Sequence, residues 1–181
     1  MNAAILASGG PTRFAGDPRG KAKAMVRIGD HPILWHLLKY YEYYGFGEFV
    51  VAVGHGGHAI RTYFDQLGHR QPPRHDGACV TIFPSAEPAW TVKLVDTGEA
   101  TMSGGQIKRL EPYLDQAPFM LTSCDRLADV DLDKLRTFHR AHGGLATLTA
   151  IHPPTRFGRV TLENDQITAF DAKGVDDAAW V

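Results

Sequence analysis

The sequence has few cysteines, little net charge and no long hydrophobic run. Its 181 residues include two cysteines, Cys79 and Cys124, without C-x-x-C spacing, which fits free thiols in a reducing cytoplasm. A net charge of −1 gives no reason to expect a nucleic acid or an anionic membrane as a partner. No apolar run approaches the roughly 20 residues that span a bilayer, and no signal-like segment opens the chain. We therefore expect a cytoplasmic protein that binds neither nucleic acid nor membrane.

The length of 181 residues predicts one domain covering 1–181, and a composition of 44% hydrophobic and 22% charged residues is typical of a globular chain. Apolar runs alternate with segments of helical periodicity, which predicts an α/β fold with an open, doubly wound, mostly parallel sheet flanked by helices. We expect strands at 3–7, 49–53, 79–83, 119–122 and 145–151, helices between Pro32 and Gly45, at 59–67 and at 132–142, and a hairpin of 159–163 with 167–170. The segment 68–77, with Pro72 and Pro73, is predicted to be a surface loop.

The stretch from Ala3 to Met25 carries the clearest functional pattern. An apolar strand runs into Ser8-Gly9-Gly10-Pro11, and four basic side chains follow: Arg13, Arg19, Lys21 and Lys23. Exposed backbone N–H groups and cationic side chains together suit a phosphate. The stretch matches neither the Walker A loop nor the G-x-G-x-x-G fingerprint, so it predicts a phosphate-binding loop of another kind.

Asp125 is the candidate metal ligand, because it follows the predicted strand 119–122 directly. Ligands of open α/β sheets bind at the carboxyl ends of the strands, so Asp125 and the loop from Ser8 to Lys23 are expected to meet. A carboxylate near phosphates suits Mg²⁺, which prefers oxygen ligands. A turn or capping role for Asp125 stays open, with Asp129 and Asp131 as alternative acids.

Two motifs resemble the amino-terminal signature of the sugar-1-phosphate nucleotidyltransferases. They are Leu6-Ala7-Ser8-Gly9-Gly10-Pro11-Thr12-Arg13-Phe14 and Lys21-Ala22-Lys23-Ala24-Met25. The likeness to the glucose-1-phosphate cytidylyltransferase branch is more specific and covers essentially the whole chain. It is carried by Val95-Asp96-Thr97-Gly98, Thr101-Met102-Ser103-Gly104-Gly105, 138–143 and 153–158.

This resemblance implies a nucleotide-diphospho-sugar transferase fold of Rossmann-like type and a reaction of CTP with glucose 1-phosphate. It implies catalytic roles for Arg13, Lys23 and Asp125, with Mg²⁺ on Asp125. The nucleotide would contact Leu6, Ala7, Ser8, Gly9, Gly10, Thr12, Arg13, Lys23, Thr101 and Gln106. Lys173 would face the sugar phosphate, and we expect a homo-oligomer.

Several residues depart from the family pattern at the implied site. Ser8 and Pro11 replace glycines, Gln106 replaces an arginine, and Ala172 replaces a glutamate. The resemblance also implies that the family's carboxy-terminal part, with its second metal aspartate, is not included in these residues. Three functions therefore remain open: an active cytidylyltransferase, an impaired relative that binds nucleotides or nucleotide sugars or serves as a partner subunit, and a mainly structural module.

Overall fold

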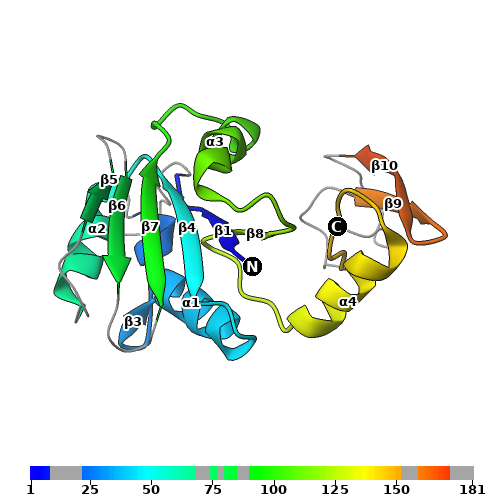
Figure 1. Ribbon diagram of the computed structural model, residues 1–181, viewed down its shortest axis with the longest axis horizontal. Helices are drawn as coiled ribbons and strands as arrows, with labels where there is room; N and C mark the ends of the chain where they lie inside the picture. Colours follow the sequence, from blue (N-terminus) through cyan, green and yellow to red (C-terminus); the bar gives the residue numbers. More distant parts are fainter. Residues whose placement is uncertain (9–21, 68–73, 77–79, 85–89, 152–158, 172–181) are drawn as a thin grey trace. The chain divides into compact units, whose positions relative to one another are not determined.

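A six-stranded sheet with the order β5-β6-β7-β4-β1-β8 organises the first part of the chain (Figure 1). The structure, a computed structural model, describes residues 1–8, 22–67, 74–76, 80–84, 90–151 and 159–171. Strands β7, β4, β1 and β8 run parallel, whereas β6 and β5 add antiparallel pairs at one side. The fold is thus the open, mostly parallel α/β sheet that the sequence predicts.

The elements have the following bounds. The strands are β1 Ala3–Leu6, β2 Arg27–Ile28, β3 His31–Pro32, β4 Glu48–Val53, β5 Arg74–Asp76, β6 Val80–Pro84, β7 Thr91–Asp96, β8 Met120–Ser123, β9 Arg159–Glu163 and β10 Gln166–Asp171. The helices are η1 Lys23–Met25, α1 Ile33–Tyr43, α2 Gly57–Gln66, α3 Ser103–Leu110, η2 Glu111–Tyr113 and α4 Leu132–His142, where η marks a short 3-10 helix.

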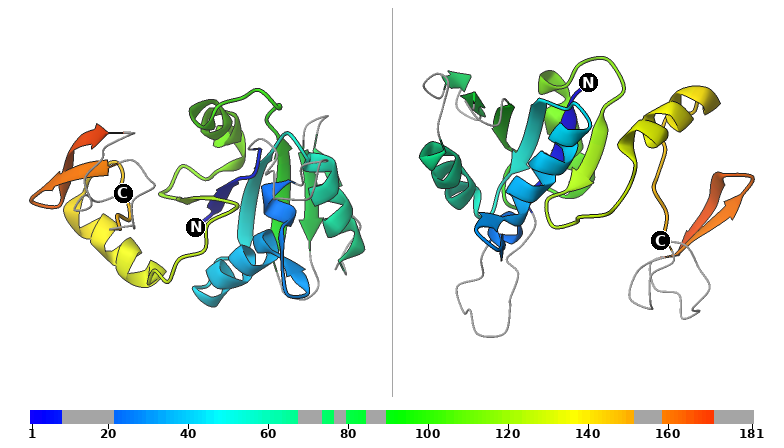
Figure 2. Two further views of the ribbon diagram at one scale, coloured as in Figure 1. Left: turned by 180° about the vertical axis from the view of Figure 1, so that it is seen from behind. Right: turned by 90° about the horizontal axis from the view of Figure 1, so that it is seen from below.

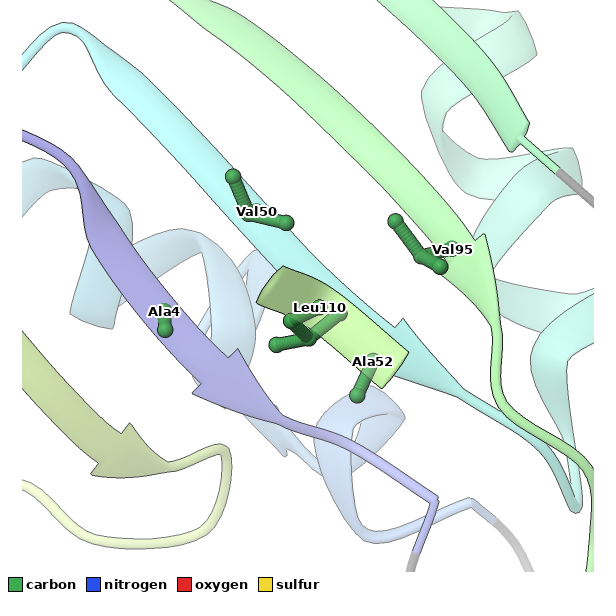
Figure 3. Packing of buried hydrophobic residues seen from close by; sticks show 5 residues of the cluster. All are labelled: Ala4, Val50, Ala52, Val95 and Leu110. Atoms are coloured by element: carbon green, nitrogen blue, oxygen red, sulfur yellow. The ribbon is translucent and has the colours of Figure 1, made fainter. Parts of the chain in front are cut away.

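Helices cover both faces of the sheet because its central strands are apolar on both faces. On one face Leu110 of α3 packs against Ala4, Val50, Ala52 and Val95 (Figure 3). Helix α1 lies behind the sheet in that view, on the opposite face. The doubly wound arrangement therefore follows from strands whose side chains are buried on both faces of the sheet.

Helix α1 ends as its sequence predicts. Gly45 has a φ of 80° and its N–H donates to Glu42 O at 2.8 Å, while the N–H of Phe46 donates to Tyr41 O at 3.2 Å. These two bonds form a Schellman motif, in which a glycine adopts the left-handed conformation just after the helix. The rings of Tyr41 and Phe46 meet edge to face across the same turn, with centroids 5.4 Å apart, which adds the apolar contact that accompanies the motif.

Contacts along the chain define two compact units, Met1–Leu132 and Asp133–Val181. The first unit contains the six-stranded sheet, and the second contains most of α4 and the hairpin β9–β10 (Figure 2). The prediction of one domain over 1–181 stays a prediction. Within the described residues, no helix has the length and apolar character needed to cross a membrane.

Most of the elements expected from the sequence are present, and three expectations are wrong. The segment 145–151 forms no strand, and Leu145, Leu148 and Ile151 are exposed. Residues 74–76 of the predicted loop form β5, and α2 begins two residues earlier than expected, at Gly57. Strand β7 and helix α3 have no counterpart among the predicted elements, although β7 lies inside the sheet.

Candidate functional site at the carboxyl ends of the strands

The strand order reverses between β1 and β8, and the candidate site lies there. Strand β4 pairs with one side of β1 and β8 with the other, so that Leu6, the last residue of β1, stands opposite Ser123 of β8. The N–H of Cys124 continues the pairing by donating to Leu6 O at 3.1 Å. A reversal of strand order opens a crevice at the carboxyl ends of the strands, where open α/β sheets bind their ligands.

Lys23 and Asp125 form an ion pair at this edge of the sheet. Lys23 Nζ lies 3.3 Å from Asp125 Oδ2, and their side chains are 40% and 30% exposed. The hydroxyl of Ser123 donates to Asp125 Oδ1 at 2.6 Å. The structure thus joins two sequence-predicted site residues that are 102 positions apart in the chain.

The surroundings of Asp125 favour its ionised form. Partial burial opposes ionisation, but the hydrogen bond from Ser123 and the ammonium of Lys23 outweigh it and hold the pKa of Asp125 below its ordinary value. The neighbouring Cys124 behaves in the opposite way, because burial and the charge of Asp125 raise the pKa of its thiol to about 12. Asp125 is therefore a carboxylate at neutral pH, whereas Cys124 is an unreactive thiol.

Close packing of small residues places Lys23. A Cβ added at Gly56 would lie 2.5 Å from the Cβ of Ala22, so the chain before η1 rests directly on the start of α2. Gly56 also has a φ of 76°, which favours glycine. Ala24 is fully buried, and the η1 turn is closed by the N–H of Met25 donating to Ala22 O at 2.8 Å. Lys23 is therefore fixed between two buried alanines.

The ends of β1, β4 and β7 also approach one another closely. A Cβ at Gly54 would lie 2.8 Å from both Ser8 Cβ and Gly98 O. Thr101 follows this edge, and Gln106 Nε2 donates to Thr101 O at 2.6 Å. Five of the predicted nucleotide contacts thus lie close along the chain to the ends of β1 and β7: Leu6 on β1, Ala7 and Ser8 after it, Thr101 after β7, and Gln106 on α3.

Two buried polar atoms in this region have no hydrogen-bond partner among the described residues. They are Ser8 Oγ and Gln106 Oε1, in side chains that are 3% and 6% exposed. The oxygen of Gln106 is the unpaired atom because Thr101 O can only accept, so the amide NH₂ must face it. Buried polar atoms are normally paired, so both atoms are candidates for contact with a ligand or with residues outside the described ranges.

Asp125 fits Mg²⁺ as a single carboxylate ligand. Mg²⁺ usually takes one or two carboxylates together with waters and substrate phosphates, and an ionised carboxylate is the oxygen donor it prefers. The described ranges contain no group of three or more His, Cys, Asp or Glu side chains arranged to hold a metal. The alternative acid Asp129 lines a separate open hollow with His36, Tyr40, Leu127 and Ala128.

The remaining predicted site residues, Gly9, Gly10, Thr12, Arg13 and Lys173, lie outside the described residues. One residue absent from the predictions also lies in the site region. Arg109 of α3 donates through Nη1 to Thr97 O and to Thr101 Oγ1, the latter at 2.7 Å. Basic residues often occupy the last turn of a helix, but the sequence analysis predicted no helix in this segment, so Arg109 was not singled out.

Curated relatives share sequence over almost the whole chain. The chain is 38% identical over 190 aligned residues to glucose-1-phosphate cytidylyltransferase of Salmonella typhi, and the match covers 100% of the chain and 72% of that relative. A probable glucose-1-phosphate cytidylyltransferase of Bacillus subtilis is 32% identical, with 98% and 70% covered. No family model matches the chain.

Solved structures show the same fold at lower identity. HddC from Yersinia pseudotuberculosis, in complex with GMP-PN, superposes with a TM-score of 0.72 at 18% identity, covering 99% of this chain and 72% of that one. A UDP-glucose pyrophosphorylase in complex with UDP-glucose gives a TM-score of 0.70 at 15% identity, covering 98% and 70%. The fold is thus the Rossmann-like fold of nucleotide-sugar transferases. Together with the sequence identity, this shows that the chain belongs to the glucose-1-phosphate cytidylyltransferase family.

Proposed function

We propose that the protein transfers the cytidylyl group of CTP to glucose 1-phosphate, which gives CDP-glucose and pyrophosphate. The observation that carries the proposal is the meeting of Lys23 and Asp125 at 3.3 Å, at the point where the strand order reverses. A cation and an ionised carboxylate at this point suit a nucleotide triphosphate and its metal ion. The 38% identity to a glucose-1-phosphate cytidylyltransferase supports the choice of substrates.

In this proposal different residues bind the phosphates, the nucleotide, the sugar phosphate and the metal ion. The loop from Leu6 through Ser8, Gly9, Gly10, Thr12 and Arg13, together with Lys23, binds the phosphates of CTP. Thr101 and Gln106 contact the nucleotide, and Lys173 faces the sugar phosphate. Asp125 holds Mg²⁺ through its carboxylate, which requires Lys23 to move from the carboxylate toward the phosphates.

The reaction proposed is a direct displacement at phosphorus. An oxygen of the sugar phosphate attacks the α-phosphorus of CTP, a new P–O bond forms, and the bond to the β-phosphate breaks so that pyrophosphate leaves. Lys23 neutralises charge on the phosphates and orients them, which is most of what phosphoryl transfer requires. When bound, Mg²⁺ supplies further neutralisation of the phosphate oxygens. No covalent intermediate with the protein is needed.

Binding without turnover is the second candidate function. It is favoured by Gln106, which stands where the family pattern has an arginine and is a neutral side chain, 6% exposed. Loss of one charge-stabilising group typically costs on the order of 10²–10³ in rate. An impaired relative of this kind would keep a nucleotide site and lose catalysis.

Calorimetric titration with CTP and CDP-glucose, with and without Mg²⁺, combined with a pyrophosphate-release assay, separates the candidates. We expect CTP binding that strengthens with Mg²⁺, and pyrophosphate release when glucose 1-phosphate is added. Asp125→Asn should lower the rate by about 10²–10³ and remove the Mg²⁺ effect on CTP binding. Lys23→Met should weaken CTP binding with or without Mg²⁺.

Lys39 and Glu42 provide matched controls. They form an ion pair on α1 with side chains that are 41% and 28% exposed, close to the exposure of Lys23 and Asp125. Lys39→Met and Glu42→Gln should leave binding and turnover within twofold of the wild type. CTP binding without pyrophosphate release would favour the second candidate, and absence of binding to both ligands would overturn both.

A further inference from the structure

We propose that Arg109 is a positioning residue that holds Thr101 in place for the nucleotide. The proposal rests on the function proposed above, because it assigns Arg109 an effect on CTP binding that passes through Thr101. Arg109 belongs to α3, whereas Thr101 lies in the segment that joins β7 to α3. A contact between them therefore ties this segment back to the helix that follows it.

A single nitrogen of Arg109 joins the two ends of the segment. Nη1 donates to the backbone oxygen of Thr97 and, at 2.7 Å, to the hydroxyl oxygen of Thr101. Both N–H bonds of Nη1 are used in this way, and hydrogen bonds from a charged donor are stronger than neutral ones. The guanidinium thus fixes the distance between Thr97 and Thr101.

The segment is anchored to the sheet at Thr97. Its N–H and its hydroxyl both donate to Val53 O, at 2.8 and 3.0 Å, and Thr97 is fully buried. Gly98 follows with a φ of 80°, and a Cβ there would lie 3.1 Å from Arg109 Nη1 and 3.3 Å from Thr101 Oγ1. Arg109 therefore links Thr101, through Thr97, to Val53 at the end of β4.

The contact also sets the direction in which Thr101 can hydrogen-bond. Its hydroxyl oxygen accepts from Arg109, so the hydroxyl hydrogen is directed elsewhere and can donate to an acceptor on a ligand. The backbone oxygen of Thr101 accepts from Gln106 Nε2 at 2.6 Å. Both oxygens of Thr101 are thus held by α3, and its hydroxyl hydrogen is left to donate to a phosphate, ribose or base oxygen of the nucleotide.

A double-mutant cycle distinguishes this role from general stabilisation of the turn. Thr101→Val and Arg109→Met should each raise the dissociation constant of CTP about fivefold to tenfold. The double variant should bind CTP no more weakly than the weaker-binding single variant, because both substitutions remove the same interaction. The KM for CTP should rise by the same factor while kcat changes less than twofold. Lys108→Met is the matched control, since Lys108 is the adjacent residue of α3, is 78% exposed and pairs with Glu111.

Thermal unfolding of each variant shows whether it is folded, and Arg109→Lys replaces Arg109→Met if the latter does not fold. A lysine keeps the charge but has a shorter side chain without the planar guanidinium that holds both N–H bonds of Nη1 in place, so it should show part of the loss. Independent losses that multiply in the double variant would overturn the proposal, as would unchanged CTP binding in Arg109→Met. A wild-type protein that binds no CTP would overturn the proposed function together with this inference, whereas a wild type that binds CTP leaves the cycle to decide the inference alone.

Discussion

The two compact units of the chain differ most in how they bury apolar side chains. In Met1–Leu132 the strands β1, β4 and β7 are buried on both faces, and Phe49, Val51 and Leu94 are fully buried. In the described part of Asp133–Val181, Val160 is the buried hydrophobic residue, whereas Leu145, Leu148 and Phe170 are 105%, 67% and 72% exposed. The first unit therefore holds the core that stabilises the fold.

Local hydrogen bonds, rather than a core, order the described part of the second unit. Its hairpin turns through Asn164 and Asp165, whose φ angles of 49° and 63° suit a two-residue turn of the type that hairpins favour. A two-stranded hairpin is at best marginally stable alone. Substitutions in the two units should therefore have very different effects on unfolding, and the predictions below test that difference.

Removal of a buried ring from the first unit should have the largest effect. Phe49 of β4 is fully buried and its ring meets that of Trp90 edge to face, with centroids 5.9 Å apart. Phe49→Ala should lower the free energy of unfolding by about 3–5 kcal/mol. Phe170→Ala, the matched change in β10, should lower it by less than about 0.5 kcal/mol. Urea unfolding of both variants measures the difference, and equal losses would show that the second unit has a core of comparable importance.

Substitution of one glycine in each unit should give a smaller difference in the free energy of unfolding. Gly56 and Gly143 have φ angles of 76° and 64°, but a Cβ at Gly56 would lie 2.5 Å from Ala22 Cβ, whereas a Cβ at Gly143 would have nothing within 4 Å. Gly143→Ala should cost about 1 kcal/mol, the cost of a left-handed residue with a side chain. Gly56→Ala should cost about 2–4 kcal/mol because overpacking is added. Thermal unfolding compares them, and losses of the same size would contradict the close packing of η1 on α2.

The elements that could be predicted from the sequence are those with strong local signals. Helix α1 has a proline at its start and Gly45 after its end, and β9 and β10 flank a polar turn. Helix α3 lacks such signals, because Ser103, Gly104 and Gly105 open it, and glycine disfavours a helix by about 1 kcal/mol per residue. Burial of Leu110 and Gln106 stabilises it instead, and that burial depends on residues distant in the sequence. The predicted strand 145–151 failed for the converse reason, since its apolar pattern has no paired neighbour among the described strands.

The site could be predicted where it follows directly from strand order. A residue after a buried strand lies at the carboxyl edge of a parallel sheet, which brings Asp125 to Lys23 as expected. Arg109 could not be found in this way, because its role depends on a side chain that reaches from α3 back to Thr97. Ala22 and Ala24 stand where the family pattern has prolines, and alanine restrains the backbone less than proline does. Close packing on Gly56 makes this segment tight instead.

The first unit contains a carboxylate, Asp125, whose ionisation should make stability depend on pH. The pKa of Asp125 is held low in the folded protein, so the stabilisation is present at neutral pH, above the unfolded-state pKa of about 3.9. It is lost as the pH falls through the lower folded-state value. Asp125→Asn should remove this contribution, of less than about 1 kcal/mol for a partly exposed pair, and flatten the acid limb of the unfolding curve. Urea unfolding of wild type and variant from neutral to acid pH measures the change, and identical acid limbs would contradict the prediction.

The smallest expected effect concerns a hydrogen-bond chain in the second unit. The N–H of Gly144 donates to His142 Nδ1 at 2.9 Å, so this nitrogen is the acceptor and Nε2 carries the proton in the neutral ring. His142 Nε2 then donates to Thr147 Oγ1 at 2.6 Å, and His139 Nδ1 lies 2.9 Å from the same hydroxyl oxygen. The bond from Gly144 therefore fixes the neutral ring of His142 as the Nε2–H tautomer, and Thr147 links that ring to His139.

Thr147→Val interrupts this chain in the middle and should lower the free energy of unfolding by only about 0.5 kcal/mol, because the groups are partly exposed. Imidazole ¹⁵N spectra at a pH where the rings are neutral provide the sharper measurement. In the variant, His142 should keep its Nε2–H tautomer, since Gly144 still donates to Nδ1, whereas His139 should lose its preference. If both rings change, Thr147 rather than Gly144 sets the tautomer of His142. If neither changes, the chain does not order the turn after α4, and the second unit depends on contacts other than these local hydrogen bonds.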